Sequence, residues 1–169
     1  MRSIISTFVI AAIVIVSDQA TKLWAVQTLK DSADIQAIPY ILSFTYVENR
    51  GAAFGMGQNL RWLFVAVSIV FIVIFCIALF KYKRQNLMVS ISAGLILGGT
   101  VGNLIDRVLN GYVVDFLQLS FFPPTCNIAD YSLTIGVVLL VIYMLFFTDA
   151  LKSDNPGGKD GNQKYIDGN

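Results

Sequence analysis

Two aspartates, Asp115 and Asp130, stand out in a chain of 169 residues that contains no histidine. An ionisable side chain near lipid is costly, so in an apolar protein it indicates a functional site. Histidine is the most common general base, and without it hydrolytic chemistry falls to carboxylates. Two carboxylates held close together share one proton, because like charges a few ångströms apart do not both ionise readily. Such a pair can activate water for attack on an amide carbonyl.

Each aspartate also has an ordinary structural interpretation. Asp130 could be an acid in the first turn of a helix, where the helix dipole favours negative charge. Asp115 could be a polar position on a half-exposed strand. Taken together in a chain without histidine, the two residues favour an aspartyl dyad. Suitable neighbours for holding its geometry are Asn103, Arg107 and Asn127.

The composition is that of a membrane protein. Hydrophobic residues make up 56% of the chain and charged residues 14%, whereas a soluble domain carries about a quarter charged residues. The formal net charge is +1 without a basic stripe, which argues against a nucleic-acid partner. The two cysteines have neither disulfide nor metal spacing, so we predict no metal site and no cofactor.

Four apolar runs are long enough to cross a bilayer, which takes roughly 20 residues each. They cover residues 4 to about 24, 60–80, 87 to about 104, and 132 to about 147. The first run has features of a cleaved signal peptide but no clear small-x-small site close behind it, so we expect a retained helix. We predict one four-helix domain over residues 1–151, followed by a polar, disordered cytoplasmic tail over residues 152–169.

Basic residues near the ends of the runs set the orientation, because cytoplasmic loops are enriched in Lys and Arg. These residues are Arg2, then Lys81, Lys83 and Arg84 between the second and third runs, and Lys152. In a four-span protein all three places fall on one side, so both termini are predicted to be cytoplasmic. Segments 27–59 and 107–131 then face outward, together with nearly every unusual polar side chain.

The outward segments contain strand-like sequence. We predict a small sheet at the membrane interface, because the aromatic and β-branched residues of 38–47 favour a strand pair or hairpin, and residues 112–119 have the same character. The small-residue loop 49–55 follows the first of them. It is either a turn that re-enters the second span or a backbone surface that a substrate approaches closely at Gly51, with Asn49 as a hydrogen-bonding group.

The third run has small residues at helical spacing. Gly94, Gly98 and Gly102 recur every four residues, with Gly99 beside them. Such residues let helix backbones approach closely in lipid, so a structural role is sufficient for them. By the same four-residue spacing, Asp106 lies on the helix face of Gly102, and Asn103 and Arg107 lie on the helix face of Gly99.

Two charged pairs also allow a structural explanation. Asp106 and Arg107 could form an ion pair at the end of a helix. Alternatively, Arg107 could direct its planar guanidinium at a carboxylate or a backbone carbonyl. Asp18 and Lys22 are four residues apart with the acid first, the spacing of a stabilising helical pair.

Five motifs occur in order along the chain: Asp18 to Lys22 (DQATK), residues 49–54 (NRGAAF), 98–107 (GGTVGNLIDR), 111–116 (GYVVDF) and 127–130 (NIAD). Over nearly all of residues 1–150 the chain resembles the bacterial prolipoprotein signal peptidases, also called signal peptidase II. The resemblance implies an aspartic endopeptidase of the bacterial cytoplasmic (inner) membrane. It implies an α-helical integral membrane fold with four transmembrane helices and a small β-cradle on the periplasmic side. Such enzymes cut before the lipidated cysteine of diacylglyceryl-modified prolipoproteins.

By position in these motifs, Asp115 and Asp130 match the catalytic pair. The matched positions that support the site or contact substrate are Asp18, Lys22, Asn49, Gly51, Asn103, Arg107 and Asn127. The family implies a structural role for Asp106, membrane lipids and peptide-like inhibitors such as globomycin as partners, and no obligate protein partner. Three positions depart from the family pattern: Thr100, Cys126 and Tyr131 stand where alanine, phenylalanine and serine are usual, and of these Cys126 and Tyr131 bear on pocket shape and substrate preference.

Two other classes of function are alternatives. A small proton- or ion-coupled transporter could use four aspartates as a relay, namely Asp18, Asp106, Asp115 and Asp130. A relay would distribute its acids across the membrane depth, whereas these are predicted to gather at one face. A non-enzymatic membrane subunit would explain the glycines of the third run but not the paired aspartates.

Overall fold

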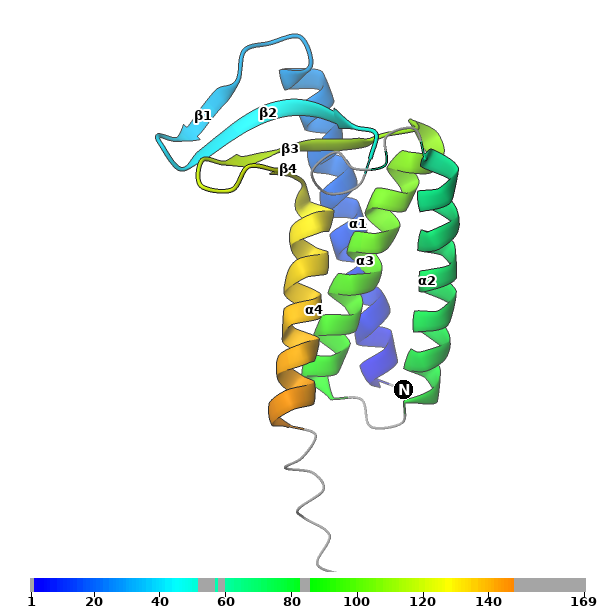
Figure 1. Cartoon of the computed structure of the whole chain (residues 1–169). Coiled ribbons are helices and arrows are strands. Elements are labelled where there is room, and N and C mark those ends of the chain that lie inside the picture. The colour runs from blue at the N-terminus through cyan, green and yellow to red at the C-terminus, as the bar shows by residue number, and fades with distance from the viewer. Residues whose placement is uncertain (1, 52–56, 58–59, 83–85, 148–169) are drawn as a thin grey trace, which may run out of the picture.

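The structure, a computed structural model, describes residues 2–51, 57, 60–82 and 86–147. The predicted tail and most of the loop 49–55 lie outside the described residues. Four helices are long and apolar enough to cross a membrane: α1 (Arg2–Leu29), α2 (Arg61–Lys81), α3 (Leu87–Leu109) and α4 (Ile128–Phe146). A small antiparallel sheet lies across one end of the bundle, which we call the sheet end (Figure 1).

The four predicted spans are confirmed, with different ends. α1 and α3 each continue five residues past the predicted ends. The added turn of α1 packs Ala25 and Leu29 against Val114 and Phe116, and the added turn of α3 carries the buried Asp106. α4 begins at Ile128 rather than at 132, since Asn127 forms the N-cap and Asp130 completes a capping box. Asp130 therefore lies inside the first turn of α4.

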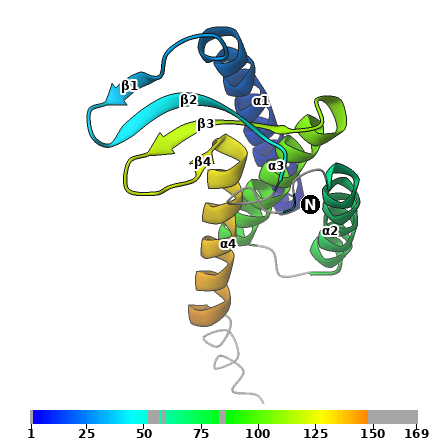
Figure 2. The ribbon, with the colours of Figure 1, turned by 45° about the horizontal axis from the view of Figure 1, so that its top comes forward.

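The sheet has the order β1-β2-β3-β4, with every neighbouring pair antiparallel. Its strands are β1 (Ile35–Ile38), β2 (Leu42–Asn49), β3 (Val113–Leu119) and β4 (Thr125–Cys126). The predicted hairpin is confirmed but begins earlier, with its turn at residues 39–41. The prediction missed β4, because two residues carry no periodic signal. The sheet extends to one side beyond the top of α4 (Figure 2).

α3 is the most buried helix and α2 the least buried. The glycines of α3 explain this difference. A Cβ placed at Gly94 would lie 2.7 Å from the Cβ of Ile10, and one at Gly98 would lie 2.6 Å from the Cβ of Val14. Both are closer than real Cβ contacts, so these glycines let α1 press directly against α3. Gly99 makes the equivalent close approach to the backbone of α4.

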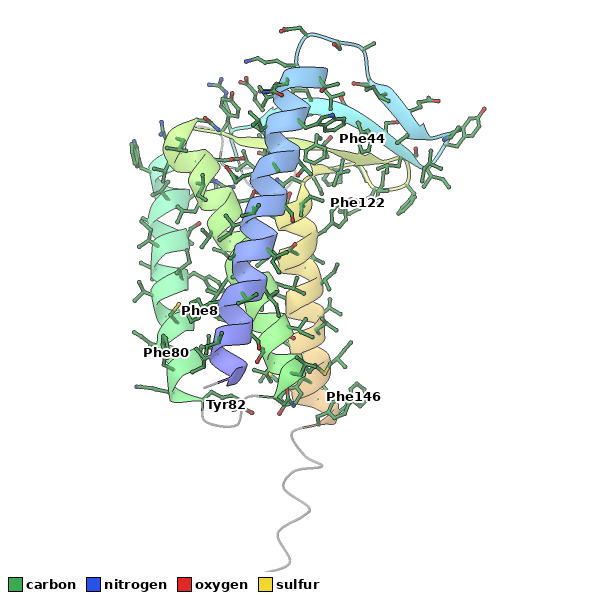
Figure 3. All side chains as sticks on the ribbon, turned by 180° about the vertical axis from the view of Figure 1, so that it is seen from behind. Phe8, Phe44, Phe80, Tyr82, Phe122 and Phe146 are labelled. Atoms are coloured by element: carbon green, nitrogen blue, oxygen red, sulfur yellow. The ribbon has the colours of Figure 1, made fainter. Side chains whose placement is uncertain are left out.

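β3 is held to the sheet end of α1 by a buried apolar cluster of Ala25, Leu29, Val114 and Phe116. Phe44 packs against this cluster. Figure 3 shows Phe44 at the sheet end of α1, and Phe122 below the sheet at the top of α4. Side chains alternate between the two faces of a strand. Because Val114 and Phe116 pack on α1, Asp115 points to the opposite face of β3.

Candidate active site

Asp115 is a buried acid on β3, with 2% of its surface exposed. Its carboxylate accepts two hydrogen bonds from asparagine amides. Nδ2 of Asn127 donates to Oδ1 at 2.6 Å, and Nδ2 of Asn49, at the end of β2, donates to Oδ2 at 2.8 Å. The strand therefore supplies the acid, and two neighbouring segments fix the plane of its carboxylate.

Asp130 is both a helix-capping residue and a residue of the cavity. Its backbone N–H donates to Oδ1 of Asn127 at 2.9 Å, and its Oδ2 accepts from the backbone N–H of Asn127 at 3.1 Å. The other oxygen, Oδ1, accepts from Nδ2 of Asn103 at 2.7 Å. The capping interpretation of Asp130 is thus confirmed, and it leaves the carboxylate on the wall of a cavity.

Two asparagine amides connect the acids. Nδ2 of Asn127 reaches Oδ1 of Asp115 and, at 3.2 Å, Oδ1 of Asn103. Asn103 in turn donates to Asp130. Both carboxylates line one cavity of about 340 Å³ between the sheet and the first turns of α4. Asp115 and Asp130 therefore line the same cavity and are linked through the amides of Asn127 and Asn103.

The electrostatics of Asp115 suit proton sharing. Burial raises the pKa of its carboxyl from 3.8 to about 7, and the negative charge of Asp130 acts in the same direction. Hydrogen bonds from Asn49 and Asn127 oppose the shift without cancelling it. Near neutral pH the side chain is therefore divided between its protonated and ionised forms, as one member of an acid–base pair must be.

This pKa predicts a pH dependence of stability that Asp115→Asn removes. Between 3.8 and about 7 the folded protein keeps a proton that the unfolded chain releases, so its stability falls as pH rises through that window. We expect the melting temperature of the wild type to fall more between pH 5 and pH 8 than that of Asp115→Asn. Thermal unfolding of both proteins in one detergent measures this difference. Parallel profiles would show that Asp115 does not titrate in this range.

A buried charge network lies beneath the acids. Nζ of Lys22, a side chain only 3% exposed, lies 2.8 Å from Oδ2 of Asp18 and 3.0 Å from Oδ2 of Asp106. It also donates to Oδ1 of Asn103 at 2.9 Å. The ammonium group thus has three acceptors, which is its full donor capacity. Asp106 pairs with Lys22 in α1, so the alternative pairing of Asp106 with its neighbour in α3 is not what the structure has.

The network also holds the backbone beside both acids. Oδ1 of Asp18 accepts from the backbone N–H of Ala129 at 2.9 Å, one residue before Asp130. Oδ2 of Asp106 accepts from the backbone N–H of Val114 at 3.1 Å, one residue before Asp115. Asp18 and Lys22 are not among the cavity-lining residues. Their contacts in the structure are with the backbone next to Asp130 and with Asp106.

Arg107 lies on the cavity wall and uses its planar guanidinium for backbone carbonyls. Nη1 donates to the carbonyl of Asn103 and Nη2 to the carbonyl of Gly51, both at 3.3 Å. Asn49, two residues before Gly51, accepts from its backbone N–H at 3.0 Å. The predicted residues Asn49, Gly51, Asn103 and Arg107 therefore meet at one place. Gly94 and Gly98 lie farther along α3 and contact α1 instead.

Part of the cavity wall carries no signal in the sequence. It consists of apolar or small residues, namely Val113, Phe122, Pro124, Thr125, Leu133 and Thr134. Beside them lie Cys126 and Tyr131, the two departures expected to bear on pocket shape. Burial raises the pKa of the Cys126 thiol to about 11, with the negative charges of both aspartates adding to the effect. The thiol is therefore neutral at physiological pH and is a small wall residue rather than a nucleophile.

The chain is similar to known proteins over most of its length. Residues 10–146 match the family described as "Signal peptidase (SPase) II". A lipoprotein signal peptidase from Halothermothrix orenii is 44% identical over 138 residues, covering 81% of this chain and 93% of that protein. One from Caldanaerobacter subterraneus subsp. tengcongensis is 41% identical over 138 residues, covering 82% and 94%. Two solved structures described as bacterial membrane enzymes each give a TM-score of 0.75. Their identities are 35%, over 94% of both chains, and 36%, over 84% of this chain and 94% of the other.

Proposed function

The chain belongs to the signal peptidase II family, and from this we propose that it cleaves the signal peptide from diacylglyceryl-modified prolipoproteins with Asp115 and Asp130 as catalytic acids. Family membership makes the protein a membrane peptidase. The observation that supports the aspartic mechanism is the placement of two carboxylates on one cavity wall, linked by amides of Asn127 and Asn103.

The reaction follows from one proton shared by the pair. The ionised carboxylate takes a proton from a bound water, and the oxygen of that water attacks the carbonyl carbon of the scissile amide. The protonated carboxyl donates its proton to the carbonyl oxygen. The carbon–nitrogen bond then breaks, and the departing amine leaves with a proton from the dyad. The titration belongs to the pair rather than to either residue.

The surroundings of the acids have complementary tasks in this proposal. Asn49 and Asn127 orient the carboxylate of Asp115, and Asn103 orients that of Asp130. Arg107 places positive charge and N–H donors beside the cavity, where they can bind the peptide backbone of a substrate. Peptide-like inhibitors such as globomycin would occupy the same cavity, and membrane lipids would surround the exposed apolar faces of the helices.

The test uses the purified full chain in detergent micelles. A prolipoprotein carrying a diacylglyceryl-modified cysteine is expected to shift on a gel to the size of the product without its signal peptide. The same precursor without the lipid is the control for substrate selection and should remain uncut. Failure of well-folded protein to cut the lipid-modified precursor would overturn the proposed activity.

The orientation is a second part of the proposal. Basic residues flank the ends of the helices opposite the sheet, which supports a cytoplasmic position for those ends and an outer-face position for the cavity. Of two reporters fused after Lys152, one that works only in the cytoplasm should therefore be active, and one that works only in the periplasm should be inactive. A reporter fused within the β1–β2 turn at Tyr40, where the side chain is 94% exposed, should give the opposite signal. A periplasmic signal from the first fusion would reverse the orientation.

A further inference from the structure

The carboxyl end of α3 is capped by a residue from another helix. A helix leaves its last four carbonyls without partners in the helix itself. The carbonyl of Asp106 accepts from the backbone N–H groups of Asn110 and Gly111, at 2.8 and 3.2 Å. The next two carbonyls, of Arg107 and Val108, accept instead from Nε and Nη2 of Arg61, at 2.7 and 2.6 Å.

The charge and the shape of the Arg61 guanidinium both suit the C-terminus of a helix. The guanidinium is a cation at a helix C-terminus, where the partial negative charge of the helix dipole stabilises it. Its planar fork reaches two successive carbonyls at once, which a lysine ammonium could not do with the same geometry. Arg61 is the first residue of α2, so these bonds tie the start of the least buried helix to the end of the most buried one.

The same turn of α2 also contacts the side chain of Arg107. The guanidinium carbon of Arg107 lies 5.3 Å from the ring centroid of Phe64, a favourable cation–π distance. Arg61 and Phe64 are three residues apart and so share one face of α2. The first turn of α2 therefore holds Arg107 twice, by its backbone carbonyl and by its side chain.

Arg61 contacts the turn into β3 as well. Gly111 has φ +84°, a left-handed conformation, and a Cβ added to it would lie 3.1 Å from Nη1 of Arg61. The guanidinium thus packs directly against the glycine of this turn. The strand that starts two residues later carries Asp115, so a shift of the turn would be transmitted to the catalytic carboxylate.

From these contacts we propose that Arg61 is a positioning residue of the active site. It does not line the cavity and acts through Arg107 and the Gly111 turn. This inference rests on the proposed peptidase function. It assigns to α2 a task beyond crossing the membrane, because α2 otherwise gives the described cavity wall no residue.

The test compares Arg61→Gln and Arg61→Lys with the wild type, with Lys30→Gln as the matched control. Lys30 is a cation near the sheet end, 46% exposed, whose contact with Glu48 is a loose 3.9 Å. Saturating and limiting concentrations of a lipid-modified prolipoprotein give kcat and KM separately, at a temperature well below each unfolding transition. We expect Arg61→Gln to lower kcat about tenfold, because small misplacements of catalytic groups cost up to about a hundredfold in rate.

Arg61→Lys should recover part of kcat, since it keeps the charge but loses the fork. Lys30→Gln should match the wild type. A merely structural role would lower the melting temperature of Arg61→Gln and leave kcat of the folded enzyme unchanged, and that result would overturn the proposal. If Arg61→Gln does not accumulate in the membrane, the test uses Arg61→Lys instead. A kcat of Arg61→Lys equal to that of the wild type would then overturn the proposal. Loss of cleavage in the wild type and in Lys30→Gln would instead reject the peptidase function itself.

Discussion

Asp115→Asn and Asp130→Asn are each expected to abolish cleavage of a lipid-modified prolipoprotein. An asparagine can neither take a proton from water nor return one to the leaving amine, so each substitution removes one half of the proton transfer. Loss of a general acid or base typically costs about 10²–10⁴-fold in rate, and a dyad that works as one unit should lie at the upper end. In a gel-shift assay that range means no product within the time in which the wild type completes the reaction.

The double variant sharpens this prediction. If the two acids work as a unit, Asp115→Asn with Asp130→Asn should be no slower than either single variant, because each single change already disables the pair. Multiplying effects would indicate two independent roles. Asp34→Asn is the matched control, because Asp34 is an exposed acid in the segment before β1. This variant should cleave the substrate at the wild-type rate. Undiminished cleavage by either dyad variant would refute the assignment.

Both dyad variants should remain folded. The carboxylate of Asp130 takes part in the capping box of α4, and losing a cap typically costs about 0.5–2 kcal/mol. Asparagine keeps one oxygen for that purpose, so the loss in Asp130→Asn should lie at the lower end. Thermal unfolding of the purified variants separates this small effect from the loss of catalysis.

Lys22→Met should have the largest effect on stability. Lys22, Asp18 and Asp106 are all at most 3% exposed, and the lysine neutralises both acids from one position. Removing it leaves two buried carboxylates facing each other without a cation. Breaking a buried ion pair by removing one partner costs about 3–5 kcal/mol, because the remaining charge is uncompensated. Unfolding followed by tryptophan fluorescence in micelles measures the loss.

A triple variant separates charge from packing. Asp18→Asn, Lys22→Met and Asp106→Asn together remove the network while each asparagine keeps an oxygen for the backbone N–H of Ala129 or Val114. We expect this protein to recover much of the stability that Lys22→Met loses, as replaced buried ion networks often do. Lys30→Met, at an exposed position, serves as the control. If Lys22→Met were as stable as Lys30→Met, the network would not contribute to stability as described.

The elements of this fold follow from local sequence patterns, and their exact ends do not. Apolar runs of sufficient length predict four helices, and β-branched and aromatic runs predict the outer strands. The true start of α4 depends on the side chain of Asn127, whose cap competes with the apolar pattern that begins later. The last turn of α1 continues past the predicted end because Ala25 and Leu29 pack against Val114 and Phe116, and that of α3 continues because Asp106 pairs with Lys22 of α1.

The candidate site divides in the same way. Charged and amide residues stand out in an apolar chain, so the sequence identifies Asp115, Asp130 and their amide neighbours. The apolar wall around Phe122 and Leu133 has no such contrast with its surroundings. The bond between Asp18 and the backbone of Ala129 joins positions 111 residues apart, and no local spacing predicts a bond of that range. Arg61 reads as an ordinary basic residue before an apolar helix until its carbonyl partners are seen.

That long-range bond also has a consequence for timing. During synthesis α1 is made first and α4 last, and chains generally fold from the N-terminal end as they emerge. The hydrogen bond of Asp18 in α1 cannot form until α4 has been synthesised, because its donor is the backbone N–H of Ala129. The two acids are therefore clamped in place only after the last helix has entered the membrane and docked against the first. We therefore expect a nascent chain at any earlier stage to have no peptidase activity, and the inserted protein to gain it only when α4 docks.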